Sequence, residues 1–86
     1  MDDIQDIQDV KQLNDIGTEH HEAGDTQTAL QYYLKALELV EDSDDKANKA
    51  LTYTNLGGVY FDLGEKEFAL EHFNDGLALY REVEDK

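Results

Sequence analysis

The feature that most constrains this chain of 86 residues is an internal repeat with an offset of 40 residues. A repeat of that size is a single helical or stranded motif that cannot bury its apolar face alone, so neighbouring copies must stack. The chain therefore has to fold as two stacked copies of one motif. The identical residues include Gly17 and Gly57, Gly24 and Gly64, Ala29 and Ala69, Leu30 and Leu70, Leu37 and Leu77, and Leu39 and Leu79.

Helical spacing of apolar residues appears within each copy. In the first copy the spacing of three or four is carried by Ile4, Ile7, Val10, Leu13 and Ile16, and then by Leu30, Tyr33, Leu37 and Val40. The chain contains no proline, which also favours helix over sheet. We predict four helices, over about residues 3–22, 26–41, 44–63 and 66–84. They form one small domain over residues 1–86, with repeat one at about 4–42 and repeat two at about 44–84.

Glycine and aspartate mark the turns between the expected helices. Gly24 can adopt the left-handed conformation that ends a helix, and Asp25 can cap the next helix. Gly64 and Glu65 occupy the same positions in the second copy. Between the copies, the acidic segment 41–45 ends the second helix and starts the third.

Two groups of small residues fall inside predicted helices, at 57–58 and 74–76. A turn would follow from local propensity alone, because each glycine destabilises a helix by about 1 kcal/mol. The apolar period nevertheless continues through both groups, as in Leu56, Tyr60 and Leu63. We therefore expect both helices to be continuous, with the small residues allowing neighbouring helices to approach closely.

The spaced signature of both copies resembles the tetratricopeptide repeat, a helix pair with small and large residues at fixed positions. This resemblance implies an all-α fold in which antiparallel helix pairs stack as a short right-handed superhelix. The copies depart from the family pattern in their 40-residue spacing, where about 34 is usual, in His20, which replaces an aromatic residue, and in lacking the customary proline. The matching positions are Leu13, Ile16, Gly17, His20, Gly24, Ala29, Tyr33 and Ala36 in copy one, and Tyr53, Leu56, Gly57, Tyr60, Gly64, Ala69, Phe73 and Gly76 in copy two.

The same resemblance implies a non-catalytic scaffold or adaptor that binds a peptide or helix of another protein. In this family the first helix of each pair lines a concave groove. Asparagine side chains there would hydrogen-bond a peptide backbone, and apolar ones would hold a side chain. The positions that this resemblance assigns to the groove are Lys11, Asn14, Thr18, His21, Leu51, Thr54, Asn55, Gly58 and Phe61.

Charge and composition exclude several other functions. The formal net charge of −14 would repel nucleic acid and anionic lipid. No apolar run is long enough to span a membrane, so we expect a soluble, cytoplasmic chain. Without cysteine there is no disulfide and no thiolate zinc site. The acidic excess itself has three interpretations, namely solubility, attraction of basic partners, or adaptation to a high-salt cytoplasm.

Neither a metal site nor a catalytic site is expected. His20 and His21 are adjacent, so on a helix their side chains point about 100 degrees apart, and no histidine follows one turn later. Ser43, the single serine, has no histidine placed as a base. We therefore predict that the chain is not an enzyme and needs no cofactor.

Self-association is the alternative to groove binding. Repeat folds need at least three units, or a polar capping helix, to cover their last apolar face. The chain would then be an oligomerisation module, for example a homodimer, or a fragment of a longer array. Ile4 and Ile7 raise the same question at the other end. The fourth helix carries more apolar residues than one neighbour can cover, namely Phe68, Leu70, Phe73, Leu77, Leu79, Tyr80 and Val83.

Overall fold

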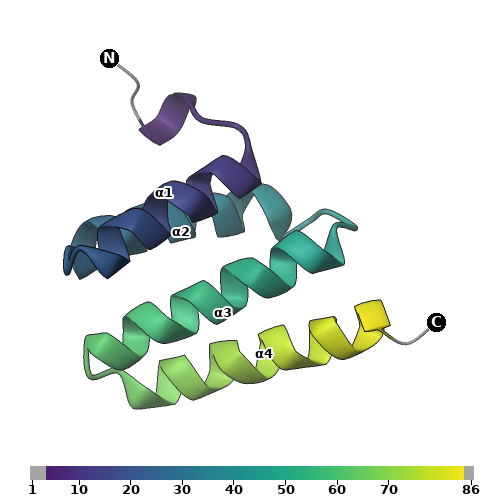
Figure 1. The fold of residues 1–86 in the computed structure, drawn as a ribbon. Coiled ribbons are helices and arrows are strands. Elements are labelled where there is room, and N and C mark those ends of the chain that lie inside the picture. Colours follow the sequence, from purple (N-terminus) through teal and green to yellow (C-terminus); the bar gives the residue numbers. More distant parts are fainter. Residues whose placement is uncertain (1–3, 85–86) are drawn as a thin grey trace.

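The computed structural model describes residues 4–84, which form one short 3-10 helix and four α-helices. The elements are η1 (Ile4–Asp6), α1 (Val10–Glu22), α2 (Thr26–Val40), α3 (Lys46–Asp62) and α4 (Lys66–Glu84). Figure 1 shows two antiparallel pairs, α1 with α2 and α3 with α4, stacked so that α1 and α3 run in the same direction. The described residues contain no strand, and the predicted all-α fold of stacked helix pairs is confirmed.

Aspartates begin the first three α-helices. The carboxylate of Asp9 accepts hydrogen bonds from the backbone N–H groups of Lys11 and Gln12. Asp25 accepts from the N–H of Thr28, and Asp45 begins α3 in the same way. Each of these bonds satisfies a donor that the first turn of a helix would otherwise leave unpaired.

The turn inside each pair contains a glycine with positive φ. The values are +87° at Gly24 and +82° at Gly64, in the left-handed region that L side chains rarely adopt. The predictions for Asp25, Gly24 and Gly64 are therefore confirmed.

The predicted start of the first helix is wrong. That helix was expected from about residue 3, which lies outside the described residues, but α1 begins at Val10 and is preceded by the separate helix η1. The physical reason is Asp9, which caps α1 and interrupts the helix despite the apolar spacing of Ile4, Ile7 and Val10. As a result, η1 packs against α2, and both Ile4 and Ile7 are partly buried.

Glycines in the first helix of each pair allow close packing against an aromatic ring in the second helix. A Cβ atom placed on Gly17 would lie 2.6 Å from Cε1 of Tyr33, and one on Gly57 would lie 2.6 Å from Cδ1 of Phe73. In the second pair a glycine of the second helix, Gly76, also allows a close contact with the first helix. A Cβ atom on Gly76 would lie 2.6 Å from Oγ1 of Thr54. Both groups of small residues lie inside continuous helices, as predicted.

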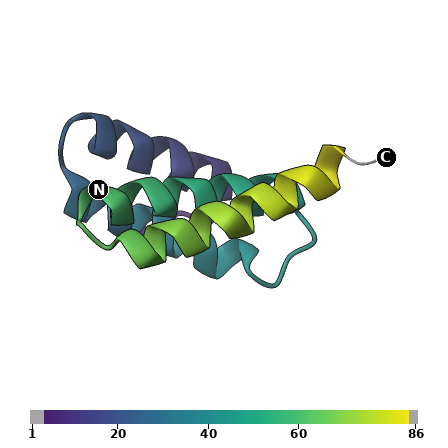
Figure 2. The same cartoon turned by 90° about the horizontal axis from the view of Figure 1, so that it is seen from below.

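The core lies between α1, α2 and α3. Five of its residues are at most 1% exposed, namely Leu13, Ala29, Tyr33, Leu56 and Val59. Helix α4 packs only against α3 among the described elements, and Figure 2 shows it as the outer layer of the stack. Most of its large apolar side chains are exposed, as expected for a helix with a single neighbour.

Candidate functional site

The candidate site is the surface formed by α1 and α3, called here the α1–α3 surface. The two helices are joined by side-chain hydrogen bonds beneath it. Nδ2 of Asn14 donates to Oγ1 of Thr52 at 2.9 Å, and Nδ2 of Asn55 donates to Oδ1 of Asn14 at 3.1 Å. Asn14 is 1% exposed and Thr52 is fully buried. This polar cluster fixes the register of repeat two against repeat one, because a shift would leave buried polar atoms unpaired.

Three of the residues assigned to the groove already make contacts within the fold, and their assignment to the groove stays a prediction. Asn14 is buried and uses both donors of its amide, the second on the Val10 carbonyl oxygen. The hydroxyl of Thr18 bonds the Asn14 carbonyl oxygen and the hydroxyl of Tyr33. Thr54 lies against Gly76 of α4. Asn14 is therefore buried, whereas Thr18 and Thr54 are partly exposed.

The other assigned residues differ in their exposure. Lys11 is exposed and forms a 3.2 Å ion pair with Asp15 one helical turn away. Leu51 is partly buried, and Asn55 is partly buried with its Nδ2 already bonded to Asn14. Phe61, in the last turn of α3, is 58% exposed.

His21 also lies on this surface, and its Nε2 contacts the carboxylate of Asp62 across the gap between α1 and α3. The imidazole ring of His21 lies beside Gly58. A Cβ atom added to Gly58 would be 3.5 Å from Cε1 of His21, which is an ordinary van der Waals distance. The polar cluster and this contact join the two helices at two points along their length.

Two residues that join α1 to α3, Thr52 and Asp62, were not predicted from the sequence. Thr52 lies between Leu51 and Tyr53 in a helix that mixes polar and apolar residues. Its neighbours in the sequence do not indicate that it is buried. Its partner, Asn14, is 38 residues away in the sequence. Asp62 is likewise 41 residues from His21. Only the stacking of the two repeats brings these pairs together.

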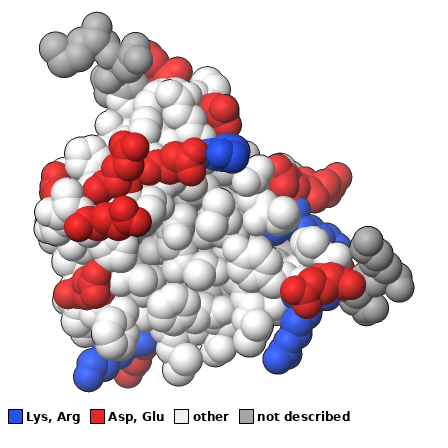
Figure 3. Space-filling model, in the orientation of Figure 1, with Lys and Arg blue, Asp and Glu red and all other residues white. Residues whose placement is uncertain are grey.

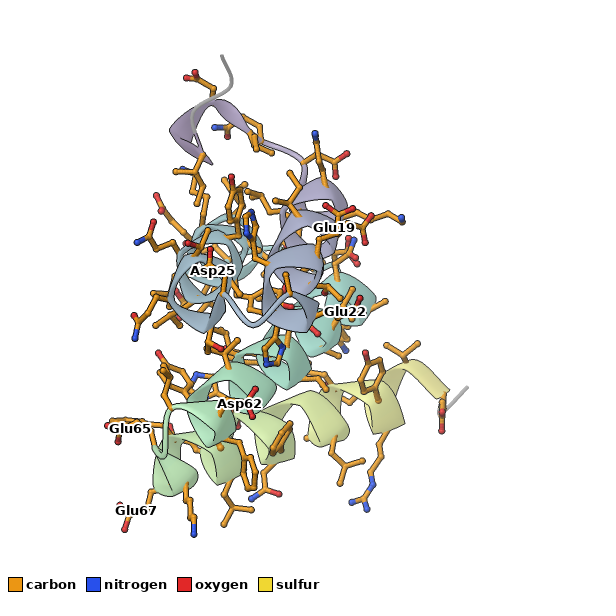
Figure 4. The ribbon with its side chains drawn as sticks, turned by 60° about the vertical axis from the view of Figure 1, so that its left-hand side comes forward. Glu19, Glu22, Asp25, Asp62, Glu65 and Glu67 are labelled. Carbon is orange, nitrogen blue, oxygen red and sulfur yellow. The ribbon has the colours of Figure 1, made fainter. Side chains whose placement is uncertain are left out.

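Acidic side chains dominate the end of the molecule where both helix pairs turn. Figure 4 labels Glu19 and Glu22 of α1, Asp25 and Glu65 of the two turns, Asp62 of α3 and Glu67 of α4 at this end. Figure 3 shows acidic atoms gathered over α1 and a broad uncharged expanse over α3 and α4. The face of the molecule seen in Figure 3 is therefore largely uncharged over α3 and α4 and acidic over α1.

Local bonding and burial shift three pKa values. Hydrogen bonds from Thr28 lower the pKa of Asp25, the cap of α2. Burial raises the pKa of Tyr33, an effect that its bond to Thr18 partly opposes. Burial and then the nearby carboxylates of Glu41 and Asp75 raise the pKa of Tyr53. Of these groups, Asp25 caps α2 and Tyr33 lies in the core.

A hollow of about 730 Å³ lies where α1 and α3 begin, lined by Asp6, Ile7, Gln8, Asp9, Val10, Gln12, Asp45 and Asn48. It is wide open to solvent and combines apolar with acidic side chains. In residues 4–84 no cluster of His, Cys, Asp or Glu has the arrangement of a metal site. None of the described helices is both long and apolar enough to cross a membrane.

Stacked helix pairs, joined through their first helices and presenting an open surface, define a helical-repeat protein of the class that binds other proteins. The chain belongs to the tetratricopeptide repeat family, whose model matches residues 12–82. Repeats of this family generally mediate protein–protein interactions as non-catalytic modules. None of the curated proteins compared with the chain matches it.

Proposed function

We propose that the α1–α3 surface binds an extended peptide or a helix from another protein. The observation that carries the proposal is Phe61, a large aromatic side chain that is 58% exposed on the helix that lines this surface. Exposed aromatic residues are frequent binding anchors because they bury much area with little loss of conformational entropy. Asn55 lies on the same helix, less than two turns earlier, and its amide oxygen has no hydrogen-bond partner among the described residues. It can accept a peptide N–H.

The partner segment should combine an apolar residue with basic residues. The six carboxylate side chains labelled in Figure 4 lie at the turn end of the molecule, where Lys66 begins α4. A basic peptide would be attracted by this field, whereas an acidic one would be repelled. The same field supports the absence of nucleic-acid and anionic-membrane partners. The proposed role is that of a scaffold or adaptor without enzyme activity or cofactor.

Fluorescence polarisation with short labelled peptides tests this function. The probe is a lysine-rich peptide that contains one phenylalanine or leucine, and the matched control peptide has glutamate in place of each lysine. The basic peptide should bind, and Phe61→Ala should raise its Kd about tenfold, as expected for loss of an aromatic anchor. Phe68→Ala is the control variant, because Phe68 is 53% exposed but lies on α4.

Two results would contradict the proposal. Equal binding of the basic and acidic peptides would show that the carboxylates do not select the partner. Equal effects of the two phenylalanine substitutions would show that binding does not use the α1–α3 surface. Asn55→Ala gives a third measurement, since it removes the peptide contact but also a hydrogen bond to Asn14, so its thermal stability must be measured alongside.

Self-association through a terminal helix is a second candidate function, and one observation favours it. Of the eight large apolar side chains that are exposed in residues 4–84, six lie on α4. Monomeric proteins rarely expose so many apolar residues on one helix, and such patches mark interaction sites. This surface is separate from Phe61, so the two functions are compatible.

A further inference from the structure

Four of the exposed apolar residues of α4 follow the spacing of a coiled-coil seam. Leu70, Phe73, Leu77 and Tyr80 are separated by three, four and three residues, and their exposed fractions are 62, 37, 48 and 36%. This alternation places them on one stripe of the helix, as the a and d positions of a heptad do. The stripe continues for one position in each direction, to Lys66 and to Glu84. We call these six residues the α4 seam.

The equivalent residues of α2 in repeat one show which element packs against this face of the helix. Its counterparts of Leu70 and Leu77 are Leu30 and Leu37, which pack against the core cluster that contains Leu56 and Val59 of α3. In repeat one, therefore, α3 covers the two leucines of the equivalent face of α2, while Tyr33, the counterpart of Phe73, packs against Gly17 of α1. Nothing in residues 4–84 occupies the corresponding place beside α4.

Helix α1 of a second copy would not pack well against α4 in the way that α3 packs against α2. The residues of repeat one that correspond to Val59 and Leu63 are Glu19 of α1 and Ala23, which directly follows α1. Val59 is fully buried in the contact between α2 and α3. Glu19 in that position would place a carboxylate among leucine side chains, which costs several kcal/mol unless the charge is paired. Head-to-tail stacking of copies is thus disfavoured.

We propose that two copies of this chain pair through their α4 seams, antiparallel and related by a twofold axis. Each copy then covers the apolar stripe of the other with the same residues, which closes the assembly at two. This inference rests on the second function proposed above and specifies its interface. A seam of this length buries a small area, so we expect a reversible dimer.

Charge determines the antiparallel direction. With α4 antiparallel, Lys66 lies opposite Glu84 of the other copy, and Leu70 opposite Tyr80. Flanking the stripe, Glu67 lies opposite Arg81 of the other copy. Each of these opposite-sign pairs occurs twice. A parallel pair would instead place Lys66 against Lys66 and Glu84 against Glu84. Among the described residues none of these four charged side chains forms another ion pair.

Light scattering on a size-exclusion column, from micromolar to millimolar chain concentration, tests the dimer. The salt concentration should be about 0.15 M, where the Debye length is about 8 Å and the repulsion between two acidic chains is largely screened. The mass should rise from that of one chain to that of two and stop there. Leu77→Glu should raise the dimer Kd at least about 100-fold. Leu34→Glu makes the same change at an exposed leucine of α2 and should leave Kd unchanged.

Charge reversal tests the direction of the helices. Lys66→Glu should weaken the dimer about threefold to tenfold, because the substituted carboxylate then faces the carboxylate of Glu84 at both ends of the seam. Adding Glu84→Lys to that variant should restore the original Kd. In a parallel pair neither variant would change the number of like-charge contacts. An unchanged Kd for Lys66→Glu would therefore overturn the antiparallel arrangement.

The remaining outcomes separate this inference from the function on which it rests. A monomer at every concentration would overturn both self-association and the α4 pairing. A dimer that survives Leu77→Glu would keep self-association and overturn the α4 seam. A mass that grows beyond two chains would show open stacking instead of a closed pair. Circular dichroism of Leu77→Glu should match the unmodified chain, because Leu77 is exposed in the single copy and its loss should not unfold it.

Discussion

The second helices of the two repeats, α2 and α4, carry leucines at equivalent positions in different surroundings. Leu30 and Leu37 are partly buried because α3 packs over them, while Leu70 and Leu77 are 62% and 48% exposed. The aromatic residues that face the first helix differ in the same way, since Tyr33 is 1% exposed and Phe73 is 37% exposed. Equivalent sequence therefore does not give equivalent energetics, because the next helix in the stack determines what is buried.

The largest expected effect comes from placing a charge at the two equivalent leucines. Leu37→Glu should lower the free energy of unfolding by about 3 kcal/mol, because it puts a carboxylate in a packed helix contact. Leu77→Glu should lower it by less than about 0.5 kcal/mol, because this side chain faces water in the single copy. Urea denaturation at low chain concentration measures both values. Equal losses would show that α4 is covered in solution even under dilute conditions.

Three glycine substitutions test how rigid the two pairs are. Gly17→Ala should destabilise by about 2 kcal/mol, because the new Cβ would meet the ring of Tyr33, which is buried and bonded to Thr18. Gly57→Ala should cost about 1 kcal/mol, since Phe73 is partly exposed and can move. Gly58→Ala is the matched control. Its Cβ has room beside His21, so helix propensity alone should stabilise by up to about 1 kcal/mol.

Thermal and urea unfolding of these three variants measure the order of stability. A stability of Gly57→Ala equal to or below that of Gly17→Ala would show that the outer pair packs as rigidly as the inner one. Destabilisation by Gly58→Ala would show that the α1–α3 contact at His21 is tighter than ordinary van der Waals contact.

Features that depend on neighbours along the chain were predictable from the sequence. The cap at Asp25, the turns at Gly24 and Gly64 and the continuous helix through Gly57 follow from local geometry and apolar period, and the structure confirms them. The start of α1 was predicted incorrectly because apolar spacing continues through Asp9, where a single capping side chain decides the boundary. Local competition of that kind is invisible to a pattern averaged over several turns.

The candidate site was less predictable than the fold. Assigning Asn14 and Thr54 to the groove by their positions in the repeat could not show which neighbouring helix each side chain faces. Asn14 turns toward Thr52 of the next repeat, and Thr54 turns toward Gly76 of its own pair. Both contacts depend on how the helices stack, which is a long-range property. Phe61, at the end of its helix, stays on the surface.

Alkaline pH should affect the inner pair through its buried tyrosine. Burial raises the pKa of Tyr33 above that of an unfolded chain, near 10. The folded state then holds the phenol proton more tightly than the unfolded chain does. The contribution of neutral Tyr33 to the stability of the fold is therefore fully present below about pH 10 and is lost as pH rises through the raised pKa. Melting temperatures from about pH 9 to about pH 11 should fall less steeply for Tyr33→Phe. Tyr53, whose pKa is also raised, accounts for part of the remaining fall.

An equally steep fall in Tyr33→Phe would show that the buried tyrosine does not control alkaline unfolding. Phe73 gives the comparison in the outer pair, because it holds the equivalent position without a hydroxyl. Phe73→Tyr should leave the alkaline slope unchanged, since a partly exposed tyrosine can ionise without unfolding the chain.

The smallest expected effect concerns a contact between a histidine and a tyrosine in each repeat. The histidine is in the first helix of repeat one and in the second helix of repeat two. His20 stacks on Tyr32 with ring centroids 5.5 Å apart, and at the equivalent positions Tyr60 contacts His72 at 5.2 Å. An exchange of the two residues keeps one ring of each kind in both pairs. His20→Tyr with Tyr32→His should therefore change stability by less than about 0.5 kcal/mol, whereas Tyr32→Ala alone should cost about 1 kcal/mol.

The reciprocal exchange, Tyr60→His with His72→Tyr, should cost more than the exchange in repeat one. Tyr60 also contacts the ring of Phe68, at 5.7 Å, so moving the tyrosine to α4 alters a second aromatic contact. His20 has only an exposed contact to Asp25, at 3.5 Å, to lose, and exposed ion pairs contribute little. Thermal unfolding of the two double variants compares them directly. If repeat two tolerates its exchange as well as repeat one does, the Phe68 contact adds no stability, and Phe68 is held in place on α4 without energetic support from α3.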